Sequence, residues 1–167
     1  LIKVNLPASV QSVRASAFAQ CDKLQTVILP DNLLSIGEEA FSRCVSLNDI
    51  TLPNRIKSIS ANTFSNCHSL PSIIIPDSVS QINAYAFYNC KSLTSIAFPA
   101  DLIGLYRHVL SGCSNLHTII WNVRKYSAFP YNESDPFSGI RSQITTFTFG
   151  DSVRLIPANI CRNMTAL

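Results

Sequence analysis

The sequence predicts a strand-dominated α/β solenoid in which about seven turns of 23 residues stack on one another. Three observations predict it, because proline, cysteine and phenylalanine each recur every 23 residues along the 167-residue chain. Three residue types that keep one period independently indicate a structural repeat. The columns are Pro7, Pro30, Pro53, Pro76 and Pro99; Cys21, Cys44, Cys67, Cys90 and Cys113; and Phe18, Phe41, Phe64 and Phe87.

Each turn begins with an L-x-x-I-x-L motif that predicts a short strand, for example Leu24, Val27 and Leu29. The alternation at I-x-L has a period of two, which places both apolar residues on one face of a strand. The proline that follows has no N–H to donate, so it ends the strand. Strands of successive turns are expected to pair in parallel, about 4.8 Å apart, and to form a sheet on one face of the solenoid.

The rest of each turn predicts a second extended piece and one helical turn. A V/L/I-x-x-I motif follows the proline, as in Leu33 and Ile36. The A-F-x-x-C motif then places Phe and Cys three residues apart, which is a neighbour spacing on a helix. A unit this small cannot bury its apolar residues alone, so the turns must stack, with a parallel sheet on one face and short helical turns opposite.

The repeat becomes irregular towards the end of the chain. A longer turn at about residues 122–149 departs from the regular spacing, although apolar residues continue the core columns. We expect residues 1–167 to form a single solenoid. Neither end shows the polar capping turn that a solenoid needs, so we also expect the chain to be a fragment of a longer protein.

These motifs, L-x-x-I-x-L-P followed by V-x-x-I and A-F-x-x-C-x-x-L, resemble the BspA-like class of leucine-rich repeats. The resemblance covers essentially the whole chain and implies a right-handed leucine-rich-repeat solenoid. Members of this class are mostly surface or secreted proteins of anaerobic bacteria and some protozoan parasites, and several act as adhesins. The resemblance therefore implies an extracellular or cell-surface location and, as partner, a host matrix or other surface protein, or a glycan.

Composition and motifs argue against several classes of function. The 13 Lys and Arg against 10 Asp and Glu leave a net charge of only +3, so no nucleic-acid partner is expected. No apolar run approaches the roughly 18 residues that span a membrane, so this segment is not expected to insert. Nucleotide-binding, zinc-protease and serine-hydrolase motifs are absent from the sequence, and neither an enzyme nor a cofactor is predicted.

The repeated cysteines predict a ladder of buried free thiols. In-register neighbours would hold their Cβ atoms about 4.8 Å apart, which exceeds the roughly 3.5–4.5 Å of a disulfide. A line of cysteines also does not suit the tetrahedral coordination of zinc. Neither a disulfide framework nor a metal site is therefore expected.

The first candidate binding surface is the outward face of the predicted strands. Residues between the core positions form a polar column and a partly apolar column, which together suit contact with a partner. The alternative is that Thr and Ile are present only because they favour strands. The polar column is Thr26, Asp49, Ser72, Ser95, Thr118 and Thr146, and the apolar column is Ile28, Thr51, Ile74, Ala97, Ile120 and Thr148.

The second candidate is the irregular turn, where basic and aromatic side chains gather. Tyr, Trp and Arg are common at binding hot spots, and insertions in solenoids usually form loops on one face. The alternative is that the aromatic side chains pack over Trp121, which we expect in the core. The candidate residues are Arg124, Lys125, Tyr126, Phe129 and Tyr131.

The leading hypothesis is a non-catalytic, adhesin-like extracellular module that binds a protein or a glycan. Two alternatives remain open: repeats that serve as a structural spacer for another functional domain on a cell surface, and an enzyme whose chemistry lies in another part of a longer chain. Bare strands at the two ends would leave unpaired sheet edges, so end-to-end self-association of the fragment is also expected.

Overall fold

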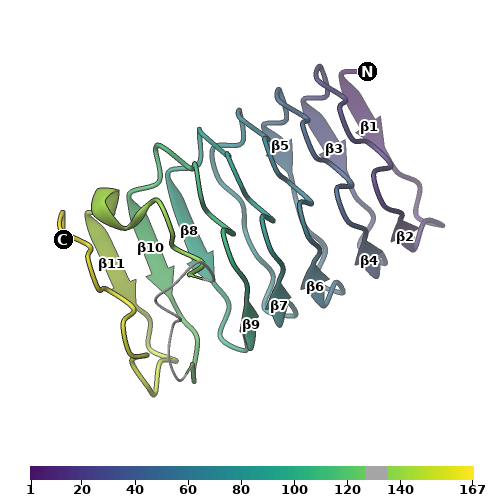
Figure 1. The fold of residues 1–167 in the computed structure, drawn as a ribbon. Coiled ribbons are helices and arrows are strands. Elements are labelled where there is room, and N and C mark those ends of the chain that lie inside the picture. Colours follow the sequence, from purple (N-terminus) through teal and green to yellow (C-terminus); the bar gives the residue numbers. More distant parts are fainter. Residues whose placement is uncertain (127–134) are drawn as a thin grey trace.

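The computed structural model describes residues 1–126 and 135–167 and shows a strand-dominated parallel solenoid (Figure 1). The strands follow one another along the stack, and the two termini lie at opposite ends of it. One side carries two three-stranded parallel sheets, formed by β1 (Lys3–Asn5), β3 (Thr26–Ile28) and β5 (Asp49–Ile50), and by β8 (Ser95–Phe98), β10 (Thr118–Trp121) and β11 (Thr146–Phe149).

The V/L/I-x-x-I motifs form the second set of short strands, as the sequence predicts. These are β2 (Ser12–Val13), β4 (Ser35–Ile36), β6 (Ser58–Ile59), β7 (Gln81–Ile82) and β9 (Gly104–Leu105). They also pair in parallel, β2 with β4, β6 with β7, and β7 with β9. The 23-residue period is therefore the register of the fold, since Ser12 pairs with Ser35 and Gln81 pairs with Gly104.

The structure supports about five regular turns, so the prediction of seven was wrong. The step between paired strands is 23 residues from Ser95 to Thr118 but 28 residues from Thr118 to Thr146. Within the described residues, no strand of two or more residues follows β11. The longer turn, which contains the short 3-10 helix η1 (Arg141–Gln143), breaks the 23-residue spacing, although β11 still pairs with β10 in register.

The prediction of short helical turns was also wrong. In each regular turn, the residue before the A-F-x-x-C motif and the residue before its Cys adopt a left-handed backbone, for example Ser16 with φ 55° and Gln20 with φ 60°. Their N–H groups donate to the next turn, to the carbonyls of Glu38 and Ser42, at 2.8 and 2.7 Å. An α-helix needs each N–H to reach the carbonyl four residues earlier, so bonding between turns replaces the helix.

The parallel sheet is interrupted at residues 72–75, where the motif predicts a strand and the structure has none. In the neighbouring turns the corresponding N–H groups continue the ladder: Asn48 donates to Gln25 at 3.0 Å and Thr94 donates to Pro71 at 3.3 Å. Pro71 has no N–H, so it cannot make this bond to the turn of β5. The core still continues through this turn, because Ile73 and Ile75 are buried.

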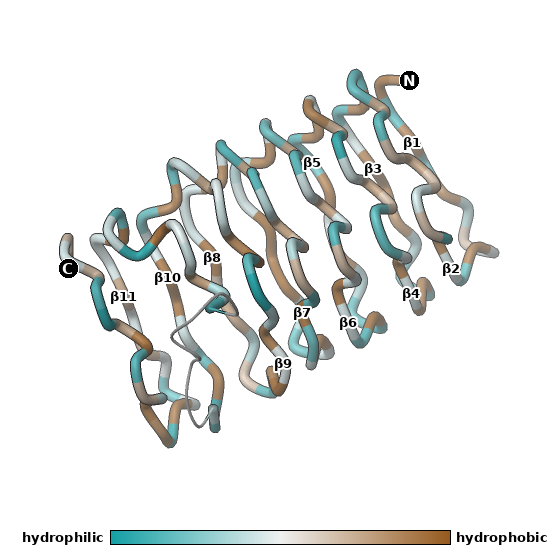
Figure 2. The backbone as a smooth tube through the Cα atoms, viewed as in Figure 1, coloured by the Kyte–Doolittle hydropathy of each residue, from teal (hydrophilic) through white to brown (hydrophobic). Residues whose placement is uncertain are grey.

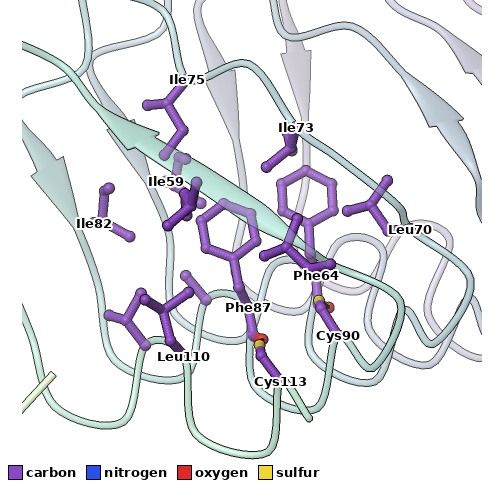
Figure 3. Close-up of a cluster of buried hydrophobic side chains, with 14 of the residues drawn as sticks. Ile59, Phe64, Leu70, Ile73, Ile75, Ile82, Phe87, Cys90, Leu110 and Cys113 are labelled. Atoms are coloured by element: carbon purple, nitrogen blue, oxygen red, sulfur yellow. Dashed lines mark hydrogen bonds between the residues drawn. The ribbon is translucent and has the colours of Figure 1, made fainter. Parts of the chain in front are cut away.

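The core is built from columns of identical or similar side chains, as the repeat predicts. Four phenylalanine rings stack in sequence from Phe18 to Phe87, with centroids 5.4, 5.7 and 5.6 Å apart and planes within 5° of parallel. Leu110 continues this column in the next turn, beyond Phe87 (Figure 3). Trp121 is also fully buried. Figure 2 shows the consequence, an alternation of apolar and polar segments along every turn.

The cysteine column is a ladder of free thiols that also forms hydrogen bonds. Each buried thiol donates to the carbonyl of the phenylalanine 26 residues earlier, at 3.1–3.2 Å. Cys21 is only half-buried, because no described turn precedes it to cover it. The four hydrogen-bonded thiols are those of Cys44, Cys67, Cys90 and Cys113.

Burial of these thiols predicts a loss of stability at alkaline pH. Burial raises the pKa of the Cys44 thiol from its ordinary value of 9.0 to about 12, and it raises the pKa values of Cys67 and Cys90 as well. Above pH 9 the unfolded chain releases protons that the folded chain retains, so the free energy of unfolding falls as pH rises. Each such thiol contributes a slope of up to about 1.4 kcal/mol per pH unit.

Urea unfolding between pH 8 and pH 11 measures this slope. The control is Cys44→Ala, which lacks one titrating thiol and should lose stability less steeply above pH 9 than the unchanged chain. Below pH 9 the two proteins should show parallel behaviour, since the thiols are protonated in both states. Equal slopes above pH 9 would contradict the prediction.

Candidate functional site

The strand face presents the two predicted columns to solvent, with the largest apolar exposure in the interrupted turn. The Ile74 side chain is 82% exposed and that of Ile28 is 43% exposed. In the polar column, Asp49 and Ser72 are exposed, while Thr26, Ser95 and Thr118 are half-buried. In the apolar column, Ile120 is half-buried beside Ala97 and Thr148, its partners on β8 and β11.

A shallow hollow of about 180 Å³ lies where the sheet is interrupted. Asp49 and Thr51 lie on one side of it, and Ser72 and Ile74 lie on the other. Residues 72–75 form no strand, so this turn does not extend the sheet of β5. The strand face therefore combines a flat ladder at each end with a polar hollow and an exposed isoleucine in the middle.

In the irregular turn, Tyr126 packs onto the core. Its ring meets Trp121 edge to face at 5.7 Å, and its hydroxyl lies 3.3 Å from the Leu105 N–H and 3.4 Å from the Leu105 carbonyl. Burial raises the pKa of this tyrosine. These contacts favour the packing interpretation for Tyr126 and leave little of the ring for a partner.

The other candidates of this turn divide between the surface and the undescribed segment. Arg124 forms an exposed ion pair with Asp101, and Lys125 is exposed. Phe129 and Tyr131 lie outside the described residues. The structure therefore brings the strand-face candidates onto one surface and does not bring the described residues of the irregular turn into a joint site with them.

The sequence analysis missed a groove on the opposite, turn-forming face. It measures about 580 Å³ and crosses four turns. The signal in the sequence is a change in one column, from Ala19, Ser42 and Ser65 to Tyr88. A column-by-column comparison of the A-F-x-x-C segments reveals this change and therefore indicates the groove. The lining residues are Ala19, Gln20, Glu39, Ser42, Arg43, Asn62, Ser65, Asn66, Tyr85 and Tyr88.

A buried ion pair was also missed, and its surroundings assign it a structural role. Arg141 and Asp135 are both buried, and their nearest polar groups are 2.7 Å apart. The same guanidinium donates to backbone carbonyls of the last turn, at residues 159, 160 and 162. These bonds tie the ion pair to the last turn, so the pair holds that turn in place.

Two further features concern ligands and membranes. Within residues 1–126 and 135–167, no three His, Cys, Asp or Glu side chains come together as a metal site would require. Across the same residues, no helix has the length and apolarity that crossing a bilayer requires.

Comparison with protein families gives a match along the whole chain. The sequence pattern of the BspA type leucine rich repeat region is found in six copies, over residues 1–117 and 35–167. No curated protein matches the chain.

Several solved structures are similar in fold. A leucine-rich repeat protein from T. pallidum is 26% identical, with a TM-score of 0.78 over 93% of this chain and 70% of its own. A leucine rich cell surface protein from Faecalibacterium prausnitzii is 20% identical, with a TM-score of 0.58 over 100% of this chain and 65% of its own. The pneumococcal vaccine antigen PcpA is 16% identical, with a TM-score of 0.52 over 92% of this chain and 55% of its own.

Proposed function

The chain belongs to the BspA type leucine-rich repeat family, and from this membership we propose that it is a non-catalytic, adhesin-like module that binds a protein partner at a cell surface. Leucine-rich repeats generally serve binding and not catalysis. Two similar structures are described as a cell surface protein and as a vaccine antigen, which supports the proposed location. The partner class that fits is a host matrix protein or another surface protein.

The observation that carries this proposal is the exposed apolar side chain of Ile74 in the partly apolar column of the strand face. Ile74 leaves 82% of its side chain in solvent, beside the hollow that Asp49 and Ser72 line. Protein interfaces bury such apolar side chains at their centre and surround them with a polar rim. Stacked repeats also provide the long, regular surface that solenoid proteins use to bind other proteins.

Replacing Ile28 and Ile74 with threonine tests the strand face without disturbing the repeat. Threonine already occupies this column at Thr51 and Thr148, so the fold accepts it. Losing two apolar contacts at an interface should weaken binding by about tenfold or more, since hot-spot side chains each contribute above roughly 1 kcal/mol. Binding of both proteins to immobilised fibronectin and fibrinogen measures the effect.

The matched control is Ile103→Ser, because Ile103 is also exposed but lies in the column of Ser80 on another side of the solenoid. Loss of binding in this control, with retention in the strand-face variant, would contradict the proposed surface. A variant with Phe129 and Tyr131 changed to alanine tests the irregular turn. If the unchanged protein binds no matrix protein, the spacer function is favoured in place of adhesion.

A further inference from the structure

The groove on the turn-forming face follows from the left-handed residues of the repeat. Each regular turn carries two of them, four positions apart, so they form two rows along the stack. One row contains Glu39, Asn62 and Tyr85, and the other contains Gln20, Arg43 and Asn66. Between them runs the column of small residues that includes Ser42 and Ser65. The small column leaves space, and the two rows supply polar side chains along its sides.

Two tyrosines close one end of the groove with aromatic surface. The rings of Tyr85 and Tyr88 meet edge to face at 5.7 Å. The ring of Tyr85 also stacks on His108 of the following turn, at 5.2 Å and 17°. The Arg107 guanidinium also lies over this ring, 5.9 Å from its centroid. Tyr85 lines the groove, whereas His108 and Arg107 do not. Both tyrosines are half-buried, so they are held in place.

The side chains of the groove retain free hydrogen-bonding capacity, while its backbone N–H groups do not. Every one of the ten lining residues donates its backbone N–H to another backbone carbonyl. The side chains of Gln20, Glu39, Arg43 and Asn62 have no hydrogen-bond or ion-pair partner among the described residues. Asn66 is fixed by bonds to Ser65 and Asn89, both at 3.0 Å. Hydrogen-bond donors for a ligand would therefore come from side chains alone.

These properties select the chemistry of the ligand. The lining contains one carboxylate, Glu39, and one guanidinium, Arg43, so its net charge is zero and it does not favour phosphate or sulfate. With no free backbone donors among the lining residues, an extended peptide has no ladder to join. Amides and hydroxyls both donate and accept, the guanidinium donates and the carboxylate accepts, and this mixture suits a ligand rich in hydroxyl groups. Aromatic faces suit its apolar C–H faces.

We propose that this groove binds a neutral oligosaccharide, with a sugar ring against Tyr85 and Tyr88 and hydroxyl groups bonded to Glu39, Arg43 and Asn62. The groove crosses three steps between four turns, on the order of 14 Å at the usual strand spacing. That length accommodates a short chain of sugar units. The site is separate from the strand face, so it does not depend on the protein-binding function proposed above.

The test replaces the two tyrosines of the groove with the residues that another turn carries in the same columns. Tyr85→Asn reproduces Asn62 of the same column, and asparagine tolerates the left-handed backbone that Tyr85 adopts at φ 59°. Tyr88→Ser reproduces Ser65 of its own column. The probes are cellotetraose, maltotetraose, laminaritetraose and chitotetraose, with saturation-transfer NMR and calorimetry. We expect at least one to bind the unchanged protein, and the double variant to bind it at least about tenfold more weakly.

The control variant is Tyr106→Asn, which removes an exposed tyrosine outside the groove. Asparagine already occupies the same column at Asn83. This variant should bind the tetrasaccharide as the unchanged protein does. Thermal unfolding of all three proteins verifies that they are folded. The proposal is overturned if no tetrasaccharide binds at millimolar concentration or if the double variant binds equally well. The strand-face variant should leave this binding unchanged, so the two proposals fail independently.

Discussion

Replacing Phe64 with alanine is expected to lower the free energy of unfolding by about 3–5 kcal/mol, the usual cost of removing a buried phenylalanine ring. Phe64 is fully buried, and its ring stacks on those of Phe41 and Phe87 at 5.7 and 5.6 Å. Its removal leaves a cavity in the middle of the ladder and takes a ring contact from both neighbours. Urea unfolding followed by circular dichroism measures the change.

Two further substitutions serve as comparisons for Phe64→Ala. Phe18 stacks on a single ring and is only half-buried, so Phe18→Ala should cost clearly less than Phe64→Ala. Phe64→Leu should lower the free energy of unfolding by less than Phe64→Ala does, by roughly 1.5 kcal/mol or below. Leucine keeps most of the side-chain volume, and Leu110 occupies this column in another turn. Equal losses for Phe18→Ala and Phe64→Ala would show that stacking between turns does not stabilise the fold.

The stacking of the turns could be predicted because its cause lies in the spacing alone. Columns such as Phe41 and Cys44 fall every 23 residues, and a structure with that register buries all of them together. The strands could be predicted for the same reason, since alternation fixes which side chains face inward. Pro71 stands at a variable position of the strand motif, so the pattern gives it no weight, but its missing N–H leaves its own turn without a strand.

The helical turns were mispredicted because a spacing of three residues between Phe and Cys fits both a helix and a pair of tight turns. The backbone at Glu39 and Tyr85 decides between them, and these residue types give no indication of a left-handed conformation. Asparagine does, because it adopts that conformation more readily than most residues. Asn62, Asn66 and Asn89 are left-handed in the structure and were the available signal.

The candidate sites differ in how far sequence determines them. The exposure of Ile74 follows from alternation within one strand motif. The position of Tyr126 does not, because it depends on contacts with Leu105, about one turn earlier in the chain. The groove of the turn-forming face depends on four turns at once, so it emerges only when columns such as Ser42 and Tyr88 are placed side by side.

Replacing Arg141 with methionine is expected to destabilise the C-terminal part of the solenoid by about 3–5 kcal/mol, the usual cost of breaking a buried ion pair. Arg141 donates to both carboxylate oxygens of Asp135, at 2.7 and 3.0 Å. It also donates to the carbonyls of Asn159, Ile160 and Arg162, at 3.2, 2.8 and 3.0 Å. Methionine leaves a buried carboxylate and three carbonyls without this donor. Hydrogen exchange should show the loss at residues 135–167 before it affects β3 and β5.

An exposed ion pair of the same chain provides the matched control. Arg124 and Asp101 leave 50% and 64% of their side chains in solvent, so Arg124→Met should cost no more than about 1 kcal/mol. Adding Asp135→Asn to Arg141→Met removes the uncompensated charge and should recover part of the loss, but not the bonds to the last turn. If Arg141→Met and Arg124→Met destabilise the protein equally, burial of the pair contributes nothing. The end of the solenoid would then be held by its apolar contacts, chiefly Ile160 and Met164, which are buried in the same core.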